Sequence, residues 1–386
     1  MKKKLAIIST HPVQYYAPLF KQLNSRGFVG VKVFYTWGEA ARKKVFDPGF
    51  GKSREWDIPL LDGYEFEFVR NISTNPGSHH FSGIKNPELV NILHQYNPDA
   101  ILVFGWNFHS HLKVLRHFKG KIPVFFRGDS TLLNEKKGFS FKKIARRIFL
   151  RWVYTHIDYA LYVGTNNKAY YVANGVSPSQ LIYAPHAIDN DRFSENENKY
   201  RLEADEWLEK LKIPARKPVA LFAGKLDHNK NVLLMAEAAK AISELSFIII
   251  GNGLLENEIE QAAAQTRNLF YLPFQNQSKM PVIYRLCDVF VLPSKLETWG
   301  LALNEAMACG CAVIATTGCG GAIDLIEEGK NGFVIAPDLS SLKEALKKCG
   351  FNKQNYFLMK QFSVKKIKKF SYDKICYAIE SLMANL

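Results

Sequence analysis

The chain has 386 residues, 47% of them hydrophobic and 23% charged, which is ordinary for a globular protein of about two domains. No uncharged apolar run reaches the ~18 residues of a membrane span, so we expect no transmembrane helix. The net charge of +15 indicates acidic partners such as nucleotide phosphates or an anionic membrane. Because the chain lacks RRM, KH and zinc-finger patterns, nucleic acid is not an expected partner.

The start of the chain and its cysteines indicate the compartment. The basic start MKKK precedes an apolar stretch, residues 5–8, that is too short for a signal peptide and is typical of a first strand. The six cysteines form no CxxC pair, and we interpret them as buried thiols in a reducing compartment. We therefore predict a cytoplasmic location.

Short apolar runs alternate with longer segments of helical pattern along the whole chain. The strands expected in the first half are residues 5–9, 31–35, 100–105, 123–127 and 159–163. Those expected in the second half are residues 219–223, 246–250, 269–272, 289–292, 312–316 and 332–335. Runs that are apolar on both faces and separated by helices are typical of parallel sheets covered by helices. The predicted fold class is α/β, with two Rossmann-like doubly wound domains facing a central cleft.

A polar and highly charged segment near residues 195–215 marks the expected domain boundary. We predict an N-terminal Rossmann-like domain over 1–198 and a C-terminal one over 199–365. The remaining helix, over 366–386, is predicted to pack back on the N-terminal domain. Ligands of doubly wound sheets bind beyond the carboxyl ends of the strands, so the loops that directly follow strands should carry the site.

Two lysines follow the first strand of the second half. In GKLDHNKN, Gly224 permits a tight turn, and Lys225 and Lys230 come after it in a strand-to-helix loop. Two lysines in such a loop can hold a diphosphate, assisted by the positive end of the next helix. The alternative is a solvated basic loop, because pairs of lysines are common.

The segment LETWGLALNE sets Glu297 and Glu305 eight residues apart around an almost wholly apolar run. If a helix begins near Thr298 or Trp299, Glu297 precedes it and Glu305 lies about two turns in, ~12 Å along the axis. Two carboxylates so placed can meet the two ends of a long, hydroxyl-rich ligand such as a nucleotide sugar. The helix N-terminus between them offers amides to phosphate. The alternative is one capping glutamate and one surface glutamate.

Residues 289–335 resemble the signature of the group-1 (family 4) retaining glycosyltransferases, which have the GT-B fold. That family carries a glutamate, seven residues and a second glutamate, followed by EAMA and a GG turn, and Glu297 and Glu305 match the pair. GKLDHNK resembles the family's GRL-x-x-x-K element, with Lys225 in place of the usual arginine and Lys230 at the second basic position. Cys311 stands where proline is usual. The resemblance covers about residues 180–340 and is looser over the N-terminal half, which binds the variable acceptor in such enzymes.

The resemblance implies a role for each matching residue. Glu297 would accept hydrogen bonds from donor-sugar hydroxyls, Glu305 from the ribose, and Lys225 and Lys230 would neutralise the leaving diphosphate. The predicted donor-binding residues are Gly224, Lys225, Lys230, Glu297, Thr298, Trp299, Gly300, Leu301 and Glu305. The predicted catalytic residues are Asp129, Glu297, Lys225 and Lys230.

Loops after the N-terminal strands supply candidates for the acceptor side. These candidates are His11, Gln14, Tyr15, His109 and Arg127. Asp129 falls about where relatives place a catalytic histidine or acid, and Arg127 is near enough in sequence to orient it. The alternative is that Asp129 caps the next turn.

No metal or other cofactor is expected. His109 and His111 have the HxH spacing of metal ligands, but no third clustered ligand is evident. The DND motif at 189–191 sits in the expected interdomain connection, and we interpret it as a turn. The lysines and the helix dipole would take the place of a cation at the diphosphate.

Residues 134–154 have the composition of an amphipathic helix that lies in a membrane interface. The basic residues are Lys136, Lys137, Lys142, Lys143, Arg146, Arg147 and Arg151. Large apolar residues, among them Phe139, Phe141, Ile144, Ile148, Phe149 and Trp152, are interleaved with them. The alternative is an amphipathic helix packed on its own domain.

The predicted function is transfer of a sugar, with retention, from a UDP- or GDP-sugar to a glycan or polyprenyl-linked acceptor. We expect a metal-independent, hexosyltransferase-type enzyme of cell-surface polysaccharide biosynthesis, peripheral on the inner face of the membrane. The alternatives are a GT-B sugar-nucleotide epimerase and a catalytically silent relative that only binds nucleotide sugars. The sequence leaves open the sugar, the base, the acceptor, the linkage and the oligomeric state.

Overall fold

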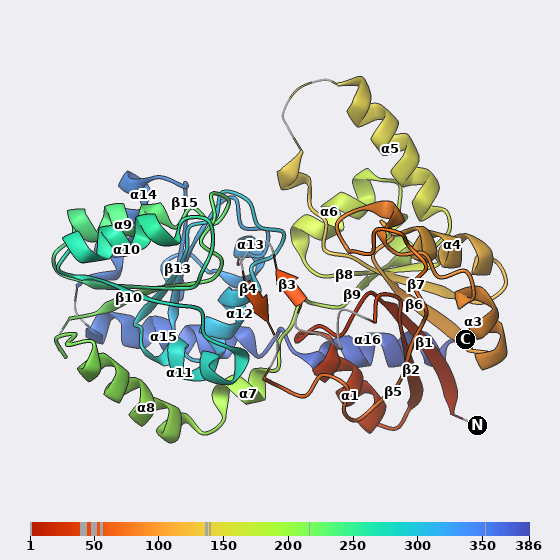
Figure 1. Ribbon diagram of the computed structural model, residues 1–386, viewed down its shortest axis with the longest axis horizontal. Helices are drawn as coiled ribbons and strands as arrows, with labels where there is room; N and C mark the ends of the chain where they lie inside the picture. The colour runs from red at the N-terminus through yellow and green to blue at the C-terminus, as the bar shows by residue number, and fades with distance from the viewer. Residues whose placement is uncertain are drawn as a thin grey trace. The chain divides into compact units, whose positions relative to one another are not determined.

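The computed structural model describes residues 2–38, 45–47, 52–54, 57–135, 138, 140–215, 217–351 and 353–386. Contacts divide the chain into two units (Figure 1). Unit 1 comprises Met1–Val45, Ile58–Pro185 and Tyr372–Leu386, and unit 2 comprises Phe46–Asp57 and His186–Ser371. Lys136, Lys137 and Phe139, three residues of the predicted interfacial segment, lie outside the described residues.

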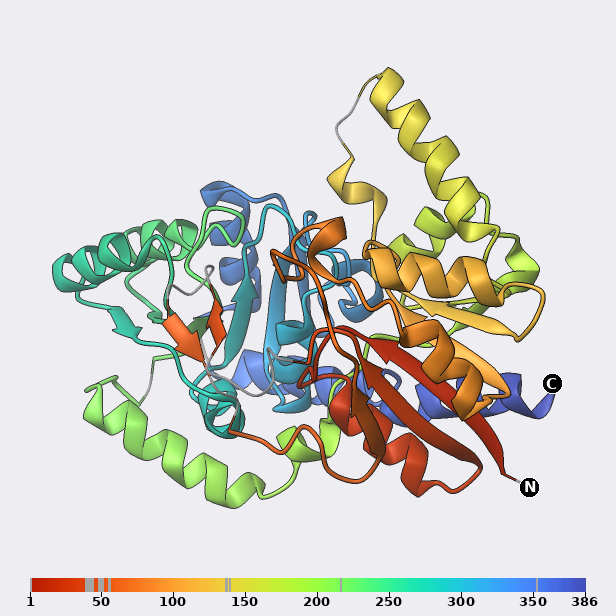
Figure 2. The same ribbon diagram turned by 45° about the vertical axis from the view of Figure 1, so that its right-hand side comes forward.

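Among its described residues, unit 1 has a sheet of seven parallel strands. In sheet order they are β5 (Glu65–Phe68), β2 (Val29–Tyr35), β1 (Lys3–Ser9), β6 (Ala100–Phe104), β7 (Val124–Arg127), β8 (Tyr159–Tyr162) and β9 (Leu181–Tyr183). Its helices are α1 (Ala17–Ser25), α3 (Leu89–Tyr96), α4 (His109–Phe118), α5 (Phe141–Tyr154), α6 (Thr165–Ala173) and α16 (Tyr372–Ala384). Helices α3 and α4 cover one face of the sheet, and α1 with α16 covers the other (Figure 2).

Unit 2 has a parallel sheet of six strands in its described part. In sheet order they are β12 (Leu269–Leu272), β11 (Ser246–Ile250), β10 (Val219–Ala223), β13 (Val289–Leu292), β14 (Ala312–Thr316) and β15 (Gly332–Ile335). Its helices are α7 (Asn190–Ser194), α8 (Glu197–Lys210), α9 (Leu233–Ala241), α10 (Glu256–Gln265), α11 (Met280–Arg285), α12 (Leu301–Ala308), α13 (Ala322–Leu325), α14 (Leu339–Cys349) and α15 (Lys353–Ile367). A separate pair of short strands, β3 (Val45–Asp47) and β4 (Lys52–Arg54), completes the list.

The central strands of both sheets are buried on both faces, as their continuous apolar sequences predict. Every residue of β6, β10, β11, β13 and β14 is buried. Such strands have to be covered by helices on each side, which is why the sequence alternates between strand and helix. All six cysteines are free and buried, as predicted.

The contacts place the unit boundaries at 185/186 and 371/372, whereas the sequence predicts 198/199 and 365/366. Residues 186–198 belong with unit 2 because α7 packs there: Phe193 is fully buried, and Arg285 donates to its carbonyl oxygen at 2.8 Å. The second predicted boundary falls inside α15, which continues to Ile367 and packs against α12. Both differences arise because the helices next to the connections, α7 and α15, pack on unit 2.

Helix α16 is bound to unit 1 along its length. The Arg26 guanidinium pairs with Glu380 at 2.8 Å, and Tyr372 Oη donates to the Tyr15 carbonyl oxygen at 2.9 Å. Lys3 Nζ donates to the carbonyl oxygen of Met383 at 2.8 Å, near the end of the helix. In the part of the chain that the structure describes, no helix is long and apolar enough to cross a membrane.

Candidate active site

The loops that follow β10 and β13 are joined to each other in unit 2. These strands are neighbours in the sheet, so their carboxyl ends and the loops after them lie side by side. The backbone of Lys295 donates to Asn229 at 2.7 Å, and the Lys230 ammonium forms an ion pair with Glu297. The structure therefore brings together two predicted donor-site residues that lie 67 positions apart.

The Lys230–Glu297 pair lies at the edge of the protein interior. The Lys230 side chain is 24% exposed and that of Glu297 is 19% exposed. The Lys230 backbone amide also donates to Asp227 Oδ1 at 2.8 Å, which fixes the turn that presents the lysine. Lys225, the other predicted phosphate-binding lysine, is half-buried in the same loop, after Gly224. A cation and a carboxylate are thus available together at the surface of one loop pair.

A glycine-rich turn after β14 packs against the backbone of the Glu297 loop. The Glu297 amide donates to Gly318 at 3.0 Å, and the Gly320 amide donates back to Glu297 at 2.9 Å. A Cβ atom on Gly320 would overlap the carbonyl oxygen of Thr298. Glycines at this turn therefore let its backbone approach the Glu297 loop closely.

Helix α12 begins at Leu301, so the prediction that it starts near Thr298 or Trp299 is wrong. The cause is Gly300, whose φ of +94° is left-handed and ends the loop just before the helix. A side chain at Gly300 would also meet Leu292 and Cys319 at 2.7–2.8 Å. Glu305 is the fifth residue of α12, about one turn in rather than two.

Glu305 is only 2% exposed, and Tyr284 Oη donates to its carboxylate at 2.6 Å. Trp299 is also buried, and its Nε1 donates to Asn304 at 2.9 Å. Glu297, Thr298 and Leu301 keep part of their surface exposed. The predicted donor-binding residues therefore fall into two groups. Glu297, Thr298 and Leu301 are accessible to a ligand, whereas Trp299 and Glu305 are buried and hold α12 in place.

Three residues of this region were missed by sequence reasoning. Tyr284 on α11 binds Glu305, Asn304 donates to the carbonyl oxygen of His186 at 3.2 Å, and the His186 ring packs on Trp299. Tyr284 and His186 lie within residues 180–340, the range over which the chain resembles the family, and that resemblance was the available signal. Asp189 of the DND motif caps α7 by accepting from Arg192, as a turn residue does.

In unit 1, a second group of predicted residues follows β1 and β7. Arg127 is 2% exposed, and its guanidinium donates to the carbonyl oxygens of Ala184 and Pro185 at 2.8 and 3.0 Å. It therefore holds the chain after β9, a contact that the prediction of an acceptor-side role did not include. Asp129 is partly exposed, and the N-cap of the next turn is Thr131.

The charges of Asp129, Arg127 and Tyr16 influence one another. Burial and, less strongly, the Asp129 carboxylate raise the pKa of Tyr16 to about 12, with Arg127 opposing the rise. Burial lowers the pKa of Arg127 from its ordinary value, while Tyr16, Tyr171 and Asp129 counteract this. Tyr16, which precedes α1, was not among the predicted residues, although its neighbours Gln14 and Tyr15 were.

The histidines of unit 1 lie in different environments. His11 is half-buried with Nδ1 at 2.9 Å from Thr10 Oγ1, and burial lowers its pKa to about 4. His111 is fully buried, its two ring nitrogens lie at 2.8–3.0 Å from Thr36 and Phe104, and burial lowers its pKa to about 4. His109 is exposed beside the ring of Phe81. The HxH spacing therefore does not form a pair of metal ligands, since both nitrogens of His111 are engaged.

Considering only the described residues, no group of three or more His, Cys, Asp or Glu side chains is arranged to hold a metal ion.

Helix α5 leaves its apolar face uncovered. Phe141 is 79% exposed and Ile148 is 63% exposed, and Ile144, Phe149 and Trp152 are also exposed. The buried residues of the helix are confined to its last five positions. The helix extends out from the rest of unit 1 (Figures 1 and 2). This exposure argues against the alternative of an amphipathic helix packed on its own domain.

Residues 203–355 match the family model described as Glycosyl transferases group 1. The match covers less than half of the chain and shows that this segment is similar to that group. It contains the joined loops of unit 2, with Lys225, Lys230, Glu297 and Glu305. The resemblance inferred from the two glutamates and the two lysines is therefore confirmed at the level of the group.

Two curated relatives come from Arabidopsis thaliana. Sucrose-phosphate synthase 4 is 29% identical over 187 residues, which cover 42% of this chain and 17% of the relative. Sulfoquinovosyl transferase SQD2 is 24% identical over 267 residues, covering 65% of this chain and 49% of the relative. The chain thus spans half or less of the length of these relatives.

Two solved structures share the fold over nearly the whole chain. Anabaena Alr3699/HepE in complex with UDP and glucose superposes with a TM-score of 0.72 at 17% identity, with all of both chains covered. WaaG, a glycosyltransferase involved in lipopolysaccharide biosynthesis, gives 0.67 at 17% identity, covering 98% of this chain and 99% of that one. The predicted fold class, GT-B with two Rossmann-like domains of parallel sheet, is confirmed.

Proposed function

We propose that the protein is a retaining glycosyltransferase that moves a hexose from a nucleotide sugar to a glycan or lipid-linked acceptor. The observation that carries the proposal is the Lys230–Glu297 ion pair, which joins two strand-end loops inside the matched group-1 domain. In a nucleotide sugar, the diphosphate requires a cation, and the hydroxyl groups of the neighbouring sugar require a carboxylate close to that cation. UDP is the favoured nucleotide, since HepE was solved with UDP and glucose.

Binding of the nucleotide sugar would break this ion pair and give each of its two residues a new partner. Lys230, together with Lys225, would turn to the diphosphate, and Glu297 would then accept hydrogen bonds from the donor-sugar hydroxyls. The backbone of 298–301, ahead of α12, would face the phosphates. Glu305 would serve the ribose from its buried position, held by Tyr284.

Lysines in this arrangement would take the place of a divalent cation during departure of the diphosphate. We therefore expect turnover to survive an excess of EDTA. Loss of turnover on chelation, with recovery on adding manganese, would contradict the metal-independent mechanism.

On the acceptor side, Asp129 is the proposed catalytic carboxylate. Arg127 and Tyr16 surround its charge, and Tyr171 fixes the loop by donating to the Gly128 carbonyl oxygen at 3.1 Å. His11, Gln14, Tyr15 and His109 are proposed to line the acceptor. The acceptor is proposed to be part of cell-surface polysaccharide synthesis, as with WaaG and lipopolysaccharide.

We also propose that α5 attaches the enzyme to the cytoplasmic face of an anionic membrane. The exposed apolar side chains would enter the interface, and Lys142, Lys143, Arg146 and Arg147 would face the headgroups. Each basic residue near such a surface contributes about 1 kcal/mol, so binding should weaken at high salt. Vesicle sedimentation tests this, with anionic and neutral lipids. Equal binding to neutral vesicles, or binding that survives replacement of these four residues by Glu, would overturn the attachment.

A screen of UDP- and GDP-sugars, with and without acceptor sugars, tests the central proposal. A transferase releases nucleotide and forms a glycoside in an acceptor-dependent manner. An epimerase would convert the donor without needing an acceptor, and a silent relative would bind the donor unchanged. Glu297→Gln should abolish most of the release, whereas Glu258→Gln, on the exposed side of α10, serves as a matched control.

A further inference from the structure

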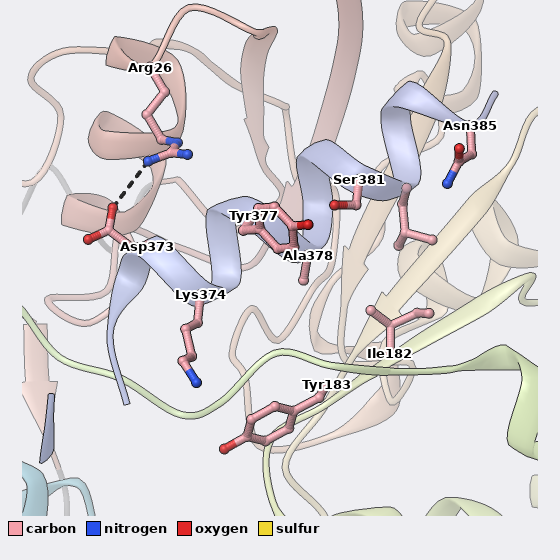
Figure 3. A pocket seen from close by; sticks show the side chains of 10 residues that line it. Arg26, Ile182, Tyr183, Asp373, Lys374, Tyr377, Ala378, Ser381 and Asn385 are labelled. Atoms are coloured by element: carbon pink, nitrogen blue, oxygen red, sulfur yellow. Dashed lines mark hydrogen bonds and ion pairs between the residues drawn. The ribbon is translucent and has the colours of Figure 1, made fainter. Parts of the chain in front are cut away.

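A pocket of about 710 Å³ lies within unit 1, between α16 and the edge strand β9 (Figure 3). Its lining residues are Arg26, Ile182, Tyr183, Asp373, Lys374, Tyr377, Ala378, Ser381, Leu382 and Asn385. The volume is in the range of pockets that hold small ligands. None of these residues belongs to the strand-end loops described above, so the proposed transfer reaction does not use them.

The walls of the pocket are fixed by contacts of unit 1. At one end Arg26 pairs with both Asp373 and Glu380, which ties the start of α16 to α1. Ala378 and Leu382 are buried on the same helix and form an apolar floor together with Ile182 of β9. A preformed pocket of this kind does not need to be ordered by its ligand.

Two exposed tyrosines border the pocket from different elements. Tyr377 of α16 is 69% exposed and Tyr183 of β9 is 39% exposed. Figure 3 shows Tyr377 on the helix and Tyr183 on the strand segment that runs along the opposite side. Large aromatic side chains that remain exposed around a hollow indicate a binding surface, because their rings offer apolar area and their hydroxyls offer hydrogen bonds.

Polar side chains on the pocket face of α16 have hydrogen-bonding capacity to spare. Within the described part of the chain, the side chains of Lys374, Tyr377, Ser381 and Asn385 make no hydrogen bond or ion pair to the protein. Lys374, Tyr377 and Ser381 follow one another at helical spacing along the same side of α16, and Asn385 directly follows the end of the helix. An ammonium, a phenol, a hydroxyl and a carboxamide can together donate to and accept from a ligand with many hydroxyls.

We propose that this pocket binds a sugar residue of a glycan chain. A sugar ring has an apolar C–H face that stacks on an aromatic ring and a hydroxyl edge that needs donors and acceptors, and this pocket offers both. A fatty chain fits less well, because it would desolvate the polar side chains without bonding to them. A phosphate also fits less well, because Arg26 is already paired and Lys374 is the remaining cation of the lining.

The pocket would hold the growing glycan at a second point, apart from the reacting end. Attachment at a second point raises the effective concentration of the acceptor end and favours longer chains. The choice of a glycan as the ligand rests on the proposed function. The binding itself requires no nucleotide sugar, so it can be tested separately.

The test is saturation-transfer NMR and calorimetry on the full chain with maltohexaose, xylohexaose, chitohexaose and hyaluronan hexasaccharide as probes. We expect at least one hexasaccharide to bind, Tyr377→Ala to weaken it at least tenfold, and Tyr377→Phe to stay within about threefold of the parent. Phe28→Ala is the matched control, because Phe28 is an equally exposed aromatic (70%) of unit 1 that does not line the pocket. Since Tyr377 is exposed, its variants should keep the parent melting temperature.

Two results would overturn the proposal: no probe binds, or binding is the same in Tyr377→Ala and Tyr183→Ala as in the parent. Farnesyl phosphate serves as a lipid probe, and its binding in place of every saccharide would also overturn it. Failure of the proposed function gives a different pattern, in which saccharides bind but no nucleotide sugar is turned over. If both hold, Tyr377→Ala should leave transfer to a monosaccharide acceptor unchanged and raise KM for the hexasaccharide.

Discussion

The Glu297 loop of unit 2 is joined to the glycine-rich turn after β14 by backbone hydrogen bonds, whereas in unit 1 the buried side chains of Arg127 and His111 bind backbone carbonyl oxygens. In unit 2, the Glu297 amide donates to the Gly318 carbonyl oxygen, and the Gly320 amide donates to the Glu297 carbonyl oxygen. In unit 1, Arg127 reaches Ala184 and Pro185, and His111 reaches Phe104. Glycines permit the first arrangement, and buried polar side chains permit the second.

The difference explains why a short motif describes one unit and not the other. A backbone contact between loops requires small residues at fixed places, so it leaves a compact pattern of glycines around the glutamates. A side chain that reaches across a unit leaves a single residue far from its partner: Arg127 and Pro185 are 58 positions apart. Loops held by backbone hydrogen bonds and loops held by buried side chains should also respond differently to mutation and to pH. Four predictions follow from this contrast.

The largest effect is expected from acid, and it should fall on unit 1. The pKa of His111 is about 4 in the folded protein because of its burial, against 6.5 unperturbed. The unfolded chain therefore takes up a proton as the pH falls below about 6.5, while the folded chain does so only near 4. Stability present above pH 6.5 is lost through this window, by roughly 3 kcal/mol for this one group.

Urea unfolding at pH 7 and pH 4.5, with hydrogen exchange followed by mass spectrometry, would locate this loss. We expect peptides of β6 and α4 to lose protection before those of β10 and β13. His111→Gln should remove the His111 share of the pH dependence, leaving the share of His11, whose pKa burial also lowers to about 4. The variant should also lower stability at pH 7. If the parent and the variant show parallel pH slopes, His111 is not the group responsible.

Glu297→Gln should lower the rate of the reaction in unit 2 without disturbing the backbone of the loop. Losing a charge-assisted hydrogen bond costs roughly 1.5–3 kcal/mol, so kcat should fall about ten- to a hundredfold. Donor KM should stay constant or fall, because Lys230 loses its ion-pair partner and becomes fully available to phosphate. Initial rates with varied nucleotide sugar separate the two parameters. A rise in KM at unchanged kcat would show that Glu297 acts in ground-state binding instead.

Gly320→Ala should disrupt the backbone contact between the glycine-rich turn and the Glu297 loop. The added methyl group would overlap the Thr298 carbonyl oxygen, and relief of such crowding typically costs about 1–3 kcal/mol. We expect a lower melting temperature together with weaker donor binding, since the Glu297 loop has to move. Gly77→Ala is the control, because a Cβ there meets no atom within 4 Å. Equal melting temperatures for the two variants would show that the loops yield easily.

The sequence predicts the sheets and carries the motif of the group because both rest on local patterns. Buried parallel strands appear as continuous apolar runs, and Glu297, Glu305, Lys225 and Lys230 lie at the spacing the group requires. The start of α12 could not be predicted, because a glycine in LETWGLALNE can sit inside a helix or end a loop. Its left-handed φ of +94°, which appears only in the folded chain, ends the loop at Gly300.

Contacts between residues far apart in the sequence could not be predicted either. Nothing in the sequence joins Lys230 to Glu297 or Tyr284 to Glu305, since each pairing depends on which strands become neighbours. The burial of Arg127 was missed for the same reason: in FFRGDS it is the last residue of an apolar strand, next to a polar loop, and resembles a side chain exposed at the strand end. The partner that makes its burial tolerable, the chain after β9, is known only once the sheet is assembled.

The smallest effect, and the sharpest test of the two glutamates, is expected from Tyr284→Phe. Glu305 is buried in the same helix that Glu297 precedes, and it depends on Tyr284 for a hydrogen bond of 2.6 Å. Removing the hydroxyl keeps the ring packed but takes a donor from the carboxylate, which costs about 1 kcal/mol. If Glu305 serves the ribose, which does not change during transfer, donor KM should rise about fivefold and kcat should hold. The control is Tyr271→Phe, which removes a hydroxyl that bonds a glutamate, Glu256, on another part of the same sheet. Equal kinetic changes in the two variants would mean that Tyr284 acts only through stability, and a fall in kcat alone would assign Glu305 to the reacting sugar.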